Sequence, residues 1–174
     1  MLTKYLIVCL LLFSCDAMAQ GHDAFFRKLR SKKGTTFHGK AIYMPDTTKA
    51  NDFWGKKLRF TISKVNGEIR MPFIVGENTS RTWILRKANG GLVLKHDHMH
   101  EDGKPDSISN YGGNSDPEIG TKYIQYFPAD EFTAKLIPAA AGNRWIMQFS
   151  PDKKKFYYIL ERDKILRFKA EFEL

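Results

Sequence analysis

The chain has 174 residues, two cysteines and a net charge of +9, from 28 Lys and Arg against 19 Asp and Glu. Both cysteines, Cys9 and Cys15, lie near the N-terminus, so the rest of the chain has no disulfide and must be stabilised by a hydrophobic core. The aromatic residues are not interleaved with the basic runs, which argues against a nucleic-acid stacking surface.

The start of the chain predicts a cleaved export signal. Lys4 precedes an apolar run, Tyr5 to Phe13, that is shorter than the roughly 20 residues of a transmembrane helix. Ala17-Met18-Ala19 is typical of a secretory cleavage site. We therefore expect a signal peptide over 1–19 and one periplasmic or extracellular domain over 20–174, without a transmembrane segment.

A second interpretation of the same stretch is a lipoprotein signal. Leu12-Phe13-Ser14-Cys15 resembles a lipobox, in which Cys15 would be lipidated and anchored. The phenylalanine fits that pattern poorly, so ordinary cleavage is the favoured prediction.

A short helix is expected over His22 to Ser31. Asp23 is suited to cap it, and Phe25, Phe26 and Leu29 form an apolar patch at helical spacing. Such a short helix is unstable alone, so the patch must pack on the rest of the domain.

After Gly34 the apolar residues alternate with period two, which indicates strands. Asn66-Gly67 is typical of a type I′ hairpin turn, and Pro72 implies an edge or a bulge. Pro138 ends a possible helical turn within 128–142. The expected strands are Thr35–Met44, Lys57–Val65, Glu68–Val75, Arg81–Lys87, a histidine-bearing strand from Gly91, Thr121–Phe127, Arg144–Ser150, Phe156–Arg162 and Ile165–Phe172.

These elements predict an all-β fold: a single antiparallel up-and-down β-barrel of 8–10 strands, calycin-like, with a short N-terminal helix. Closing the sheet removes exposed edges, and a barrel of that size holds one small ligand. We expect a monomer.

Three of the five histidines follow an apolar stripe on one predicted strand face: His96, His98 and His100. Imidazoles at this spacing can converge on zinc or another divalent transition metal, with Asp102 completing the set. Two alternatives stay open: a structural network that holds the 102–118 loop, and a role for the histidines toward a non-metal ligand or a proton.

The candidate ligand contacts are Arg81, Trp83, Tyr111 and Glu161. If Arg81 points inward it needs a carboxylate, for which Glu161 is the candidate, and such a pair would suggest an acidic ligand. If Arg81 points outward it is a rim charge.

The residues thus favour an exported protein that binds a small molecule or a metal. One alternative is a metal-assisted hydrolase or isomerase that uses the histidine cluster. Another is an envelope interaction protein whose basic runs, at 27–33 and 153–155, contact an anionic surface.

Two resemblances add to this interpretation. The helix followed by Gly34 to Lys40 resembles the entry of lipocalin-like barrels, although the G-x-W signature is absent. Lys95 to Gly103 (KHDHMHEDG), Tyr111-Gly112-Gly113 and Phe127 to Asp130 resemble an uncharacterised family of small secreted bacterial proteins. The second resemblance implies a compartment but no mechanism.

Overall fold

A computed structural model describes residues 21–45, 52–88, 90–100, 102–116 and 118–174. The expected signal peptide, its cleavage site and the alternative Cys15 anchor lie outside the described residues. In the described part of the chain, no helix combines the length and the apolar character needed to cross a bilayer.

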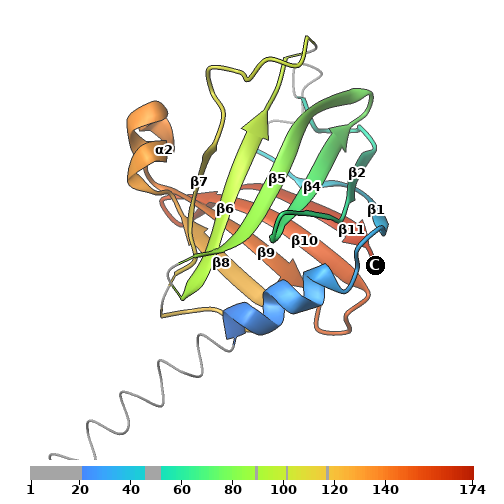
Figure 1. The fold of residues 1–174 in the computed structure, drawn as a ribbon. Helices are drawn as coiled ribbons and strands as arrows, with labels where there is room; N and C mark the ends of the chain where they lie inside the picture. The colour runs from blue at the N-terminus through green and yellow to red at the C-terminus, as the bar shows by residue number, and fades with distance from the viewer. Residues whose placement is uncertain (1–20, 46–51, 89, 101, 117) are drawn as a thin grey trace, which may run out of the picture.

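The domain is built almost entirely from antiparallel strands, and residues 21–30 form a helix at its beginning (Figure 1). A second helix, α2, spans Glu131–Leu136, and a short 3-10 turn follows at Pro138–Ala140. The strands are β1 Thr36–Tyr43, β2 Leu58–Thr61, β3 Ser63–Val65, β4 Glu68–Val75, β5 Asn78–Ala88, β6 Gly91–His98, β7 Tyr111–Asn114, β8 Ile124–Pro128, β9 Asn143–Phe149, β10 Lys155–Arg162 and β11 Ile165–Glu173.

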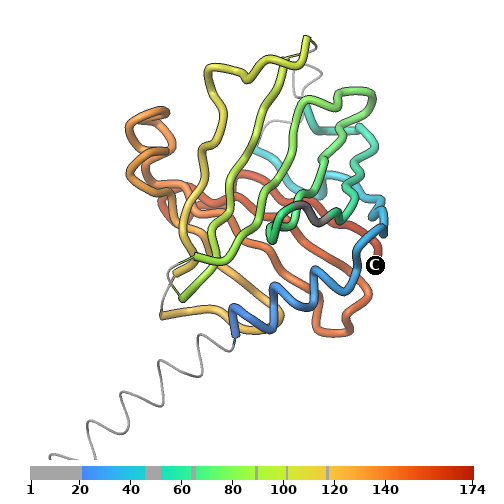
Figure 2. The backbone as a smooth tube through the Cα atoms, viewed as in Figure 1, coloured from blue at the N-terminus to red at the C-terminus, as the bar shows by residue number. Residues whose placement is uncertain are grey.

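The strands form one sheet that curls into a nearly closed barrel, in the order β7-β6-β5-β4-β2-β1-β11-β10-β9-β8, with β3 paired to β4. The backbone trace in Figure 2 winds up and down between neighbouring strands. The seam lies between β7 and β8, where Gly113 forms an isolated bridge with Ala129 and the Asp116 N–H donates to the Tyr126 carbonyl at 2.9 Å. The predicted all-β barrel with a short N-terminal helix is confirmed.

Local expectations hold at the turns. Asn66 and Gly67 both have positive φ, 50° and 87°, as a type I′ turn requires. Pro72 lies opposite the break between β2 and β3, because Phe73 pairs with Phe60 and Arg70 pairs with Ser63. Its missing N–H therefore falls where the ladder is already interrupted.

The two ends of the barrel differ. The helix over 21–30 lies across one end (Figure 1), where Phe25, Phe26 and Leu29 are buried and Phe25 packs edge-on against Phe149 at 5.6 Å. Phe60 lies at the centre of the core and contacts four other rings. The other end has no such plug among the described residues and holds a cavity.

Candidate ligand site

The open end of the barrel contains a cavity of about 290 Å³. It lies between β4–β7 on one side and β9–β11 on the other. Its apolar walls are formed by the side chains that point inward from these strands, and most of these side chains are aromatic. The principal rings are Phe73, Trp83, Tyr111, Trp145, Tyr158 and Phe168.

His96 lies in the inner wall of this cavity and is buried. Its Nδ1 lies 3.1 Å from the Tyr111 carbonyl oxygen, and its Nε2 makes a short hydrogen bond with the Tyr158 hydroxyl. A carbonyl can only accept, so Nδ1 carries the proton and the Tyr158 hydroxyl donates to Nε2. Burial lowers the pKa of His96 to about 3, so the ring is neutral near pH 7.

His98, one pleat nearer the mouth, also lines the cavity. Its Nε2 lies 3.1 Å from the Tyr111 hydroxyl, and its backbone N–H donates to Ser109 Oγ at 2.8 Å. Burial lowers the pKa of His98, and the positive charge of Arg81 lowers it further. Burial also raises the pKa of Tyr111 to about 12, so both members of this pair are neutral near pH 7.

The third histidine lies apart. Strand β6 ends at His98, and the exposed His100 follows it in the loop, with its backbone N–H donating to the Lys104 carbonyl at 2.8 Å. Asp102 pairs with Lys104 at 3.0 Å in solvent. Within the described residues, no group of three or more His, Cys, Asp or Glu side chains is placed to hold a metal ion. Both nitrogens of His96 are already hydrogen-bonded to the protein.

Arg81 points into the cavity mouth, but its partner is not the one expected. Its guanidinium lies 3.5 Å from Asp52 and 5.4 Å from the centre of the Phe53 ring. The predicted pairing with Glu161 is wrong, because Glu161 binds Arg144 at 2.6 Å, directly across the β9–β10 ladder. Of the four candidate ligand residues, Arg81, Trp83 and Tyr111 meet at the cavity, and Glu161 does not line it.

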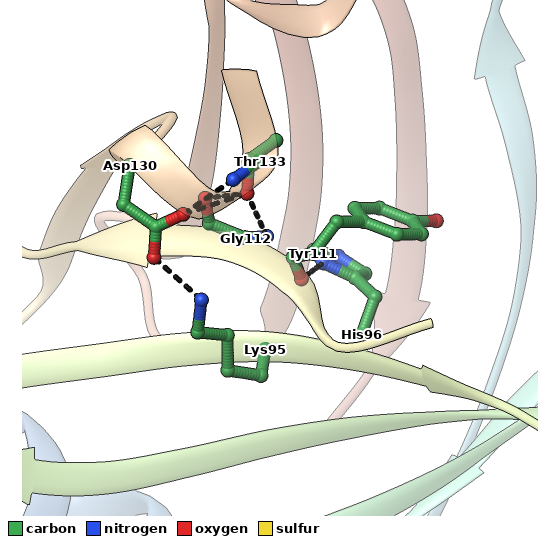
Figure 3. A network of polar contacts seen from close by, with 6 residues as sticks. All are labelled: Lys95, His96, Tyr111, Gly112, Asp130 and Thr133. Carbon is green, nitrogen blue, oxygen red and sulfur yellow. Dashed lines mark hydrogen bonds and ion pairs between the residues drawn. The ribbon is translucent and has the colours of Figure 1, made fainter. Parts of the chain in front are cut away.

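Beside His96, a polar network connects β6 and β7 at the seam of the barrel to α2 (Figure 3). Lys95 pairs with Asp130 at 2.5 Å, and the Gly112 N–H donates to the Thr133 hydroxyl at 2.7 Å. Asp130 also caps α2 by accepting from the Thr133 N–H at 2.9 Å. Burial raises the pKa of Asp130, but hydrogen bonds from Lys95 and Thr133 outweigh this and lower it overall. The network fixes β7, and with it the Tyr111 carbonyl that orients His96.

Tyr158 and Trp145 were not among the candidate ligand residues. The period of two was enough to place both on the inner face of their strands. It did not reveal that Tyr158 meets His96, which lies 62 residues earlier in the chain.

Comparison with known proteins assigns no relative to this arrangement: no family model matches the chain, and no curated protein matches it either.

Proposed function

We propose that this protein is an exported binding protein that holds a small ligand inside its aromatic cavity. The observation that supports this most strongly is the cavity itself, an apolar space with a few convergent polar groups at the open end of a barrel. Its volume of about 290 Å³ is at the low end of ligand pockets, so the ligand must be small. The signal pattern at 1–19 supports export.

The aromatic rings of the cavity walls are packed against one another. Trp83 is stacked between Phe73, at 4.3 Å and 20°, and Tyr158, at 4.2 Å and 18°. His96, which pairs with Trp83 across the β5–β6 ladder, stacks on Tyr111 at 4.7 Å and 9°. A site whose side chains are already ordered loses little conformational entropy when it binds, which favours affinity for flat ligands.

Two polar groups of the cavity wall, His96 and Tyr158, are poorly suited to acid–base catalysis, which supports a binding role. His96 is a neutral, fully hydrogen-bonded ring, and burial raises the pKa of Tyr158 well above its usual range. A general acid or base works best with a pKa close to the operating pH, which neither group has.

Filling the cavity should weaken binding. Leu160 lines the cavity, whereas Tyr157 lies on the opposite face of β10. We expect Leu160→Trp to weaken binding of the neutral probe 2-naphthalenemethanol by about tenfold or more, and Tyr157→Trp to leave it unchanged. Isothermal titration calorimetry measures both affinities. Equal binding by the two variants would place the probe elsewhere and contradict the proposal.

A second candidate function is contact with an anionic envelope surface. Lys28, Lys122 and Lys153 place their ammonium groups 5.4, 5.1 and 5.5 Å from the centre of the Tyr123 ring. We call these three residues the lysine cluster. Among the described residues none of the three forms an ion pair with a carboxylate. Burial raises the pKa of Tyr123, but Lys122 and Lys153 lower it overall.

If the lysine cluster serves this function, the protein should co-sediment with phosphatidylglycerol-containing vesicles at low salt and dissociate as salt screens the charges. Replacing all three lysines with glutamine should abolish co-sedimentation. The matched control replaces Lys104, Lys135 and Lys164, which are exposed elsewhere, and removes the same charge. Equal loss in both triple variants would indicate net charge rather than the cluster.

A further inference from the structure

We infer that the ligand of the cavity is a small aromatic carboxylate whose acidic group binds Arg81. This inference rests on the proposed ligand-binding function and specifies the chemistry of its ligand. Two features of the cavity support it: the charges of its lining and its flat aromatic walls.

The charged side chains among the described residues that line the cavity are arginines. Arg81 and Arg167 both line it, and none of the described lining residues is Asp or Glu. The histidines beside them are neutral near pH 7 because burial lowers their pKa values. An anion entering the barrel therefore meets attraction without a competing carboxylate in the wall.

Within the described part of the chain, Arg81 has weak polar contacts. Its side chain is 17% exposed, and its carboxylate partner among the described residues, Asp52, is 69% exposed and lies 3.5 Å away. Charge-assisted hydrogen bonds between Arg and carboxylates are normally about 2.7–2.9 Å long. A ligand carboxylate held in the cavity is shielded from water, so it can bind the guanidinium in a bidentate manner more strongly than the exposed Asp52 does.

Two indole rings line the same space. Trp83 and Trp145 are 2% and 3% exposed, and both line the cavity. Neither indole N–H has a hydrogen-bond acceptor among the described residues, whereas every fully covered side-chain nitrogen or oxygen there has a partner. Neither N–H group is therefore fully covered. A buried indole N–H usually has an acceptor, which a ligand oxygen would provide.

The shape of the walls selects an aromatic body for this acid. The stack of Phe73, Trp83 and Tyr158 adjoins the His96–Tyr111 pair, and Trp145 is tilted beside them at 5.0 Å from His96. Flat walls and a volume of about 290 Å³ suit one or two fused rings better than a long flexible chain.

The test compares two probes of the same size on the full mature protein: 2-naphthoate, which carries the carboxylate, and 2-naphthalenemethanol, which does not. We expect calorimetry to show at least about tenfold tighter binding of the acid. Arg81→Gln should remove this preference while leaving the affinity for the alcohol within about twofold. Arg86→Gln, an exposed arginine on the same strand, is the matched control and should keep the preference.

Equal affinity for the two probes in the unaltered protein would overturn the inference, and this comparison needs no variant to fold. A preference that persists in Arg81→Gln would also overturn it, because Arg81 would then not be the anion-binding group. If neither probe binds, the proposed ligand-binding function itself fails. These results are therefore distinguishable from one another.

Discussion

Acidification from pH 7 to pH 5 should lower the free energy of unfolding by about 2 kcal/mol, mainly because of His96. The unfolded chain has a histidine pKa near 6.5, whereas burial lowers the pKa of His96 in the folded protein to about 3. Between these two values the unfolded chain binds a proton that the folded protein excludes. Each pH unit in that range therefore removes about 1.4 kcal/mol of stability.

The same reasoning predicts that the loss continues to about pH 3, where it would total about 4 kcal/mol from His96 alone. The pKa of His98 is also lowered by burial, so His98 acts in the same direction. Carboxylates with lowered pKa values, such as Asp130, stabilise the fold above their unfolded pKa of about 3.9 and lose that contribution below it. The loss of unfolding free energy between pH 6.5 and pH 5 is thus specific to the histidines.

Urea unfolding at several pH values measures this effect. His96→Gln should flatten the dependence of stability on pH between 6.5 and 5, although the variant will be less stable overall because it disrupts a buried hydrogen-bond pair. His38→Gln is the control, since His38 is exposed, and it should retain the slope of the unaltered protein. Parallel curves for the unaltered protein and His96→Gln would show that His96 is not the group responsible.

Gly113→Ala should lower the free energy of unfolding by about 3 kcal/mol or more. Gly113 lies on β7, paired with Leu94 on one side and bridged to Ala129 on the other. A methyl group added at this position would lie 1.8 Å from the Pro128 carbonyl oxygen. Because that oxygen belongs to the backbone of β8, the substitution must force the two edges of the barrel apart.

Gly90→Ala is the matched control for that substitution. Gly90 has a φ of +76°, but a methyl group there meets no atom within 4 Å. Its expected effect is therefore limited to about 1 kcal/mol of backbone strain. Chemical denaturation of both variants distinguishes the cost of backbone strain at Gly90 from the cost of steric overlap at Gly113. Equal stabilities of the two variants would mean that β7 and β8 can move apart at the seam without loss of stability.

The pattern of residues in the sequence was sufficient to predict the barrel fold and part of the ligand site. Alternation with period two places Trp83 and His96 on inward faces, and Asn66-Gly67 fixes one hairpin, but the direction of Arg81 stayed open. It also extends the histidine strand too far, since β6 ends at His98. The chain pairs His100 with Lys104 there instead, and periodicity contains no information about such a local turn.

Contacts between strands that are distant in the sequence were harder to predict than the strands themselves. Pairing Arg81 with Glu161 required a guess across the barrel, whereas the register of the β9–β10 hairpin already sets Arg144 opposite Glu161. Hairpin register was thus a usable signal for that ion pair. The bonds from Tyr158 to His96 and from Lys95 to Asp130 depend on how the barrel curls shut, which a single sequence does not specify.

The pairing of β1 with β11 has a consequence for how the chain acquires its structure. Gly39 lies opposite Phe172, so the ladder that joins β1 to β11 brings together segments from near the two ends of the described chain. Such long-range closure is entropically expensive and slow compared with hairpin formation. For a polypeptide exported as proposed, this delay is useful, because translocation requires a chain that has not yet folded. The order of the strands would then keep the barrel open until almost the entire polypeptide has crossed.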